Sequence, residues 1–161
     1  MQTKNTALTK AILEDHREMT RRIAGLLDAL KRDDCKTAFQ LAEELDRVAG
    51  PHIEFEEETF YPLLIEVRGR EFVERLYHEH GEGRKAIEAL LALKKAGEPL
   101  GTVRCKELLQ EVQTALDHAG TCGTLLSHVS ALDESRQAKL LEKLQEARQR
   151  RHHWTELVPR D

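Results

Sequence analysis

Four long segments of the sequence place apolar residues at helical spacing, and polar or glycine–proline stretches separate them. They run over about residues 6–31, 35–67, 70–96 and 102–127, so each is long enough for a bundle helix. Helices of this length with short connections pack as an up-down-up-down antiparallel four-helix bundle. Strong helix formers dominate, and no stretch has the pattern of a strand. We therefore predict an all-α single domain over residues 1–161, with the bundle over about 6–128.

A shorter fifth helix is expected after the bundle, over about residues 133–154. Asp133 and Ser135 are residue types that favour a helix N-cap. Leu140, Leu141 and Leu144 give this helix an apolar face for packing. Within the second long segment, Gly50-Pro51 predicts a kink, because proline removes one backbone donor and clashes with the preceding turn.

Charge, hydropathy and cysteine content exclude several classes of protein. The formal net charge is −4, so no bulk positive charge favours nucleic acid. No window approaches the roughly 18 apolar residues of a membrane helix, and the N-terminus lacks a signal-peptide core. Cys35, Cys105 and Cys122 are an odd number without CxxC spacing, which disfavours a disulfide framework. We expect a cytoplasmic protein without nucleic-acid or membrane partners, and the sequence does not define its oligomeric state.

Each long segment carries one histidine within its apolar face: His16, His52, His80 and His118. A buried imidazole needs partners for two ring nitrogens, and a core rich in Leu and Ala supplies few. A metal ion would satisfy several imidazoles at once, and neutral imidazole is the commonest protein metal ligand. The alternative is that each histidine is an ordinary core residue with its own hydrogen-bond partners.

A carboxylate follows the second of these histidines by one helical turn. Glu56 lies four residues after His52 and therefore on the same helix face. Mixed histidine and carboxylate ligation suits iron, manganese or zinc, and inward Glu and His side chains build di-iron sites in helical bundles. Glu58 is expected to face solvent. For Glu57, the sequence does not decide between solvent and the bundle interior.

These motifs resemble those of hemerythrin-like proteins, the HHE cation-binding family. The resemblance is carried by Asp15-His16, by the stretch HIEFEE with Phe60-Tyr61-Pro62, by Glu79-His80 and by His118. It covers roughly residues 8–144, and the second-helix motif is its most specific part. It implies a four-helix bundle with a non-haem, usually di-iron, centre. Members of the family bind oxygen, or sense oxygen, iron or redox state, and some react with peroxide or nitric oxide.

The sequence departs from the family pattern on the third and fourth helices. The family often has a second His or Glu one turn after the third-helix histidine, where this chain has Arg84. It also expects a carboxylate four or five residues after the fourth-helix histidine, where this chain has Cys122 and Gly123. The resulting metal-ligand candidates are His16, His52, Glu56, His80, His118 and Cys122.

These candidates suffice for one metal ion, or for two ions with open positions. We expect non-haem iron, one or two ions, with zinc as the alternative. Cys122 is open to three roles: a thiolate ligand, a redox-active sulfur, or a small buried apolar residue. Gly81, Gly83, Gly120 and Gly123 either are tolerated in their helices or leave room for a small ligand on that side of the metal.

Three functions remain compatible with the sequence. The favoured one is a metal-binding carrier or sensor that takes a small diatomic ligand or small anion, such as oxygen or nitric oxide. The second is a redox enzyme, peroxidase-like or handling nitric oxide, with Cys122 as a redox residue. The third is a helical interaction module whose buried histidines only resemble a site. A binding or sensor protein is favoured over an enzyme.

Overall fold

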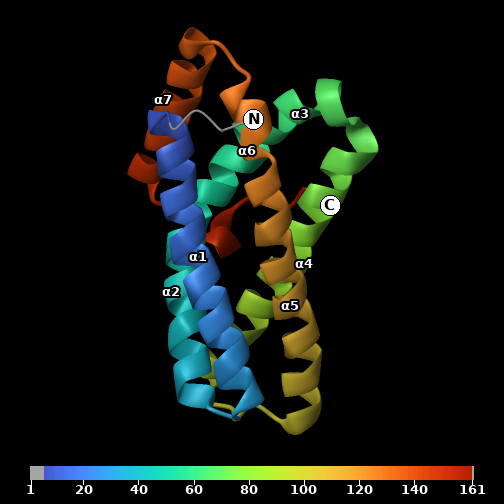
Figure 1. Ribbon diagram of the computed structural model, residues 1–161. Coiled ribbons are helices and arrows are strands. Elements are labelled where there is room, and N and C mark those ends of the chain that lie inside the picture. The colour runs from blue at the N-terminus through green and yellow to red at the C-terminus, as the bar shows by residue number, and fades with distance from the viewer. Residues whose placement is uncertain (1–5, 161) are drawn as a thin grey trace.

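The computed structural model describes residues 6–160, and all regular secondary structure in this range is helical. Four long rods form the bundle: α1 (Ala7–Lys31), α2 (Cys35–Phe55) with its continuation, α4 (Arg70–Ala96) and α5 (Thr102–Thr124). α1 packs against α2 and α5, and α4 packs against the same two helices (Figure 1). The prediction of an all-α bundle is confirmed.

Local capping explains where several helices begin and end. Thr6 caps α1 by accepting a hydrogen bond from the backbone N–H of Thr9 at 3.3 Å. Asp34 caps α2 in the same way, through the N–H of Thr37 at 3.1 Å. α4 ends where Gly97 takes a left-handed conformation, with φ of 67°, which glycine adopts without steric cost.

The second long helical segment contains an irregular turn after Pro51. α2 remains helical through Pro51, and the irregular turn is the π-helix η1 (Glu56–Phe60), which leads into α3 (Tyr61–Arg68). The N–H of Tyr61 bonds to the carbonyl of Glu56, five residues back. At 100° per residue, Tyr61 would point about 140° away from Glu56. The wider π turn lets both side chains face the bundle interior.

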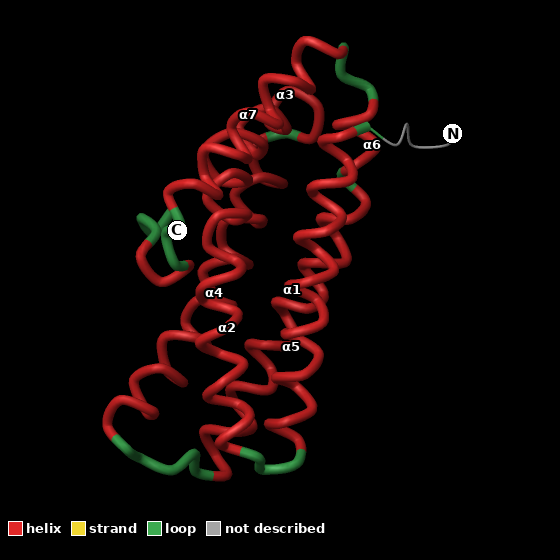
Figure 2. Tube along the Cα trace, turned by 90° about the vertical axis from the view of Figure 1, so that its left-hand side faces the viewer, coloured by secondary structure: helices red, strands yellow, loops and turns green. Residues whose placement is uncertain are grey.

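The chain after α5 covers one end and one side of the bundle. α6 (Leu126–Ser130) and α7 (Glu134–Arg150) follow, and α7 packs against α1 and α2. The predicted fifth helix extends to about residue 154, which is wrong at its end: Arg151 has φ of 56°, and this left-handed residue stops α7. Residues 151–160, the C-terminal strap, contain the 3₁₀ turn η2 (Trp154–Glu156) and lie against α2 and α4 (Figure 2).

Two apolar clusters fill the bundle, and a polar layer separates them. In α1, Ile12 belongs to one cluster and Met19 to the other, and His16 lies between them. In α5, Ala115 and Cys122 flank His118 in the same way. The inward histidines therefore lie at one level of the bundle.

None of the helices over residues 6–160 combines the length and the apolar character that a membrane span requires.

Candidate metal centre

The four histidines predicted to face inward are all buried in the polar layer between the two apolar clusters. The exposed fractions of His16, His52, His80 and His118 are 8%, 1%, 4% and 7%. Each comes from a different long helix, so the centre joins all four rods of the bundle. Glu56, from the first position of the π turn, is 4% exposed and lies among them.

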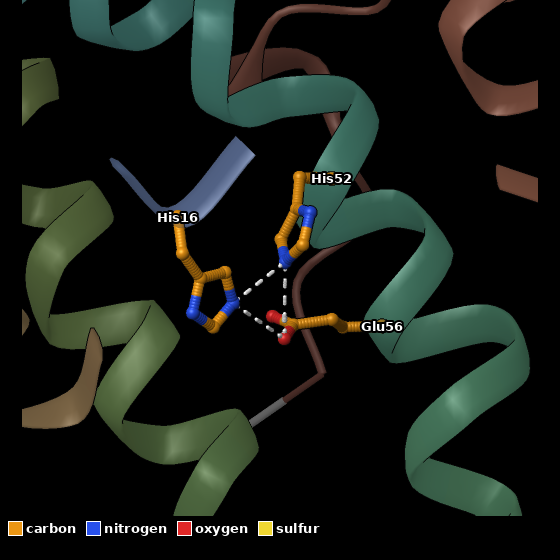
Figure 3. Close-up of side chains that lie close together, drawn as sticks. All are labelled: His16, His52 and Glu56. Carbon is orange, nitrogen blue, oxygen red and sulfur yellow. Dashed lines mark hydrogen bonds and ion pairs between the residues drawn. The ribbon is translucent and has the colours of Figure 1, made fainter. Parts of the chain in front are cut away.

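One group of donor atoms, the His16 cluster, consists of His16, His52 and Glu56. The Nε2 atoms of the two histidines are 3.0 Å apart, and Glu56 Oε1 lies 3.2 Å from His52 Nε2 and 3.6 Å from His16 Nε2. Figure 3 shows the two imidazoles and the carboxylate pointing toward one another. One donor atom of each residue lies within 4.8 Å of the others, a spacing at which a single metal ion can be held.

The second group, the His80 cluster, consists of Glu56, His80 and His118. Glu56 Oε2 lies 3.3 Å from His80 Nε2, so the two oxygens of one carboxylate face the two clusters. The hydroxyl of Tyr61 lies at the centre of this second group, 3.1 Å from Glu56 Oε2, 3.1 Å from His80 Nε2 and 3.2 Å from His118 Nε2. Glu56 therefore belongs to both groups of donor atoms.

Three carboxylates orient the imidazoles through their other ring nitrogens. The Nδ1 atoms of His52, His80 and His118 pair with Asp15, Glu57 and Glu79 at 3.0, 2.9 and 2.7 Å. When Nδ1–H donates to a carboxylate, the Nε2 lone pair is left for a metal, and the carboxylate also makes the imidazole a better ligand. The Nε2 atoms are the ones that meet in the two clusters.

The sequence only partly revealed these supporting carboxylates. Glu57, whose orientation the sequence does not decide, is buried and bonded to His80, whereas Glu58 is exposed as expected. Asp15 and Glu79 received no role, although each directly precedes an inward histidine in the sequence. Each of the two reaches across to the histidine of a neighbouring helix, which a pattern read along single helices does not show.

Cys122 lies beside the His80 cluster. Its Sγ is 3.1 Å from His118 Nε2 and 3.3 Å from the hydroxyl of Tyr61. Burial and the negative charge of Glu56 raise the pKa of this thiol well above its usual value, so it is protonated in the metal-free protein. Cys35 and Cys105 lie elsewhere, and all three are free.

Arg84 points away from the centre and holds the C-terminal strap instead. Its guanidinium donates to the carbonyls of Leu157 and Thr155, and to Glu88 at 2.7 Å. Gly83 does not leave room for a ligand, because a Cβ at this position would lie 2.7 Å from Trp154 Cη2, whereas a Cβ at Gly120 or Gly123 would meet nothing within 4 Å. The side of α4 that carries Gly83 is therefore covered by Trp154.

In the metal-free centre, protonated histidines balance the negative charge of the buried carboxylates. Burial alone would lower the pKa of His52 and His80, but Glu56 with Asp15 and Glu57 raises both from 6.5 to about 9. Burial would also raise the pKa of Glu56, but the imidazoles hold it well below its usual value. The carboxylates are thus neutralised by protons that metal ions can replace.

A small cavity of about 30 Å³ lies beside both clusters. A single water requires roughly 10–15 Å³ of such space, so the cavity has room for a molecule of a few atoms. Its polar lining consists of residues of the two clusters together with Cys122 and Glu79. The remaining lining residues are apolar: Met19, Ile23, Leu45, Ala49, Ile53, Ala115, Ala119 and Trp154. The centre therefore has room for a small ligand next to its donor atoms.

Comparison with known protein families identifies this constellation. The hemerythrin HHE cation binding domain matches residues 7–120, which include both clusters and their supporting carboxylates. The chain has no significant match among curated proteins or among solved structures. The family match ends before α7 and the C-terminal strap. Because it covers well over half of the chain, the protein belongs to the hemerythrin HHE cation-binding family.

Proposed function

We propose that this member of the hemerythrin HHE family holds two metal ions, one in each cluster, and that Glu56 bridges them. The observation that supports this most is that Glu56 turns one oxygen to each cluster, within 3.2 Å of His52 Nε2 and 3.3 Å of His80 Nε2. In a buried layer between two apolar clusters, such a carboxylate is otherwise costly. His16 and His52 would hold one ion, and His80 and His118 the other.

Iron is the metal that we propose, because imidazole and carboxylate donors suit it. Bound iron would supply an open coordination position for a small molecule. The protein's residues supply the rest: the carboxylates of Asp15, Glu57 and Glu79 orient the imidazoles, and the cavity gives a small molecule room beside them. The proposed role is to bind or sense a diatomic molecule such as oxygen or nitric oxide. A cytoplasmic location is part of this proposal.

The test is to load metal-free protein with ferrous iron without oxygen and count the bound ions. We expect two ions per chain, and a change in visible absorption when nitric oxide is added. Less than a tenth of an ion per chain, with either iron or zinc, would refute the proposal. Binding of zinc but not iron would preserve the site and refute a role in diatomic binding.

A second candidate function is a redox enzyme that uses Cys122. It is favoured by one observation, the 3.1 Å distance between Cys122 Sγ and His118 Nε2. If the sulfur takes part in the chemistry, Cys122→Ser should abolish peroxide turnover while two ions remain bound. Equal peroxide turnover in the variant and the parent protein would exclude the cysteine from the reaction.

A further inference from the structure

Two hollows meet at one side chain of the C-terminal strap, outside the segment that the family match covers. The cavity of about 30 Å³ lies inside the bundle, beside the donor clusters. A second hollow, a pocket of about 160 Å³, lies between α4 and the strap. His80 and Trp154 are the residues that line both. Because His80 is one of the metal-ligand candidates, the side chain that separates the pocket from the centre is the indole of Trp154.

The helices beneath the strap are shaped to receive it. A Cβ at Gly83 would lie 2.7 Å from the indole Cη2, so the indole occupies the space of a missing α4 side chain. A Cβ at Gly50 would lie 2.0 Å from the carbonyl oxygen of His152, so the strap backbone rests directly on α2. The indole is 5% exposed. The sequence therefore leaves room on both helices at the two points where the strap crosses them.

Polar contacts fix the strap on both sides of Trp154. Asp46, buried in α2, accepts hydrogen bonds from the N–H of Thr155 at 2.8 Å and from its hydroxyl at 3.2 Å. Arg84 of α4 holds the carbonyls of Thr155 and Leu157. The family often places a metal ligand where this chain has Arg84. Here that position instead anchors the strap that carries the indole.

We propose that the pocket between α4 and the strap is the route by which small molecules reach the metal centre, and that Trp154 is the gate that limits their size. The proposal rests on the proposed function for the presence of metal, but the partition by the indole is a property of the chain alone. With Trp154 in place, the inner cavity admits only molecules of a few atoms. Removing the indole joins the two hollows and opens the centre to ring-sized ligands.

The test compares Trp154→Ala with the parent protein, using two probes. In iron-loaded protein, azide should change the visible spectrum of both forms, whereas imidazole should bind the variant at least tenfold more tightly than the parent. In metal-free protein, xenon should bind the variant at least tenfold more tightly than the parent, measured by the shift of its ¹²⁹Xe resonance. Val103→Ala, which changes an α5 residue that is 75% exposed and lines neither hollow, serves as the matched control and should behave as the parent.

The outcomes separate this inference from the proposed function. If no form binds metal, the proposed function fails, and the xenon measurement still decides whether the indole closes the cavity. If metal binds and Trp154→Ala binds imidazole and xenon no more tightly than the parent does, the gate is refuted. If Trp154→Ala fails to fold, Trp154→Leu replaces it, because leucine keeps an apolar side chain against Gly83. Trp154→Leu should bind the same two probes more tightly than the parent, with a smaller gain than Trp154→Ala. Probe binding identical to that of the parent would again refute the gate.

Discussion

Replacing Gly50 by Ala tests whether the strap lies where the structure places it. The new Cβ would lie 2.0 Å from the carbonyl oxygen of His152 and 2.8 Å from the backbone nitrogen of Trp154. Both are backbone atoms, so no side-chain rotation can relieve the contact. In an open helix, Ala is more favourable than Gly by roughly 1 kcal/mol, so packing and helix propensity oppose each other.

The strap has to move, and the contacts that it would lose give the decrease in the free energy of unfolding. Asp46 is 4% exposed, and three hydrogen bonds link it to His153 and Thr155. Leaving a buried acceptor unsatisfied costs about 1–3 kcal/mol. Withdrawing Trp154 from the core adds up to about 3–5 kcal/mol, the range for removing a large aromatic side chain. After the gain in helix propensity, Gly50→Ala should destabilise the protein by about 3 kcal/mol or more.

The assay is urea unfolding of metal-free protein, followed through Trp154, the single tryptophan of the chain. In Gly50→Ala, the folded-state emission should move to longer wavelength as the indole becomes hydrated. The matched control is Gly120→Ala in α5, where a Cβ would meet nothing within 4 Å. That control should gain roughly 0.5–1 kcal/mol. If Gly50→Ala gains as much as Gly120→Ala and its emission is unchanged, the packing of the strap on α2 is refuted.

Three further predictions concern the centre. Glu57→Gln should weaken metal binding about 10–100-fold, because His80 loses a supporting carboxylate, and competition with a chelator measures this. The control Glu58→Gln changes the next residue, which is exposed, and should bind metal as the parent does. Glu56→Gln should reduce the iron count below two per chain, and an unchanged count would contradict the bridge. In metal-free protein the pKa of His52 and His80 is about 9 against 6.5 unfolded, so their stabilisation is complete below pH 6.5 and lost as pH rises through 9. Its free energy of unfolding should fall by roughly 3 kcal/mol for each of the two histidines between pH 6.5 and 9.5, about 6 kcal/mol together, and a rise over that range would contradict the protonated pairs.

Much of this arrangement could be predicted from the sequence, because it depends on periodicity within single helices. The four inward histidines follow from their places in apolar stripes, and the pairing of His52 with Glu56 follows from a four-residue spacing. All of these side chains are buried at one level of the bundle. Their role as metal ligands stays a prediction, as does that of Cys122.

What could not be predicted depends on irregular backbone and on contacts between distant segments. Tyr61 faces the centre only because the π turn shifts its direction relative to Glu56, and spacing at 100° per residue gives the wrong side. Arg84 and Gly83 were interpreted without the strap, although both contact residues more than 70 positions away. A helical pattern carries no information on such a partner.

Anomalous scattering from crystals of iron-loaded protein tests most directly whether Glu56 bridges two metal ions. We predict two anomalous peaks at the iron edge in each chain, one in the His16 cluster and one in the His80 cluster, with the Glu56 carboxylate between them. A single peak, or a peak bound only by exposed residues outside these clusters, would contradict the claim.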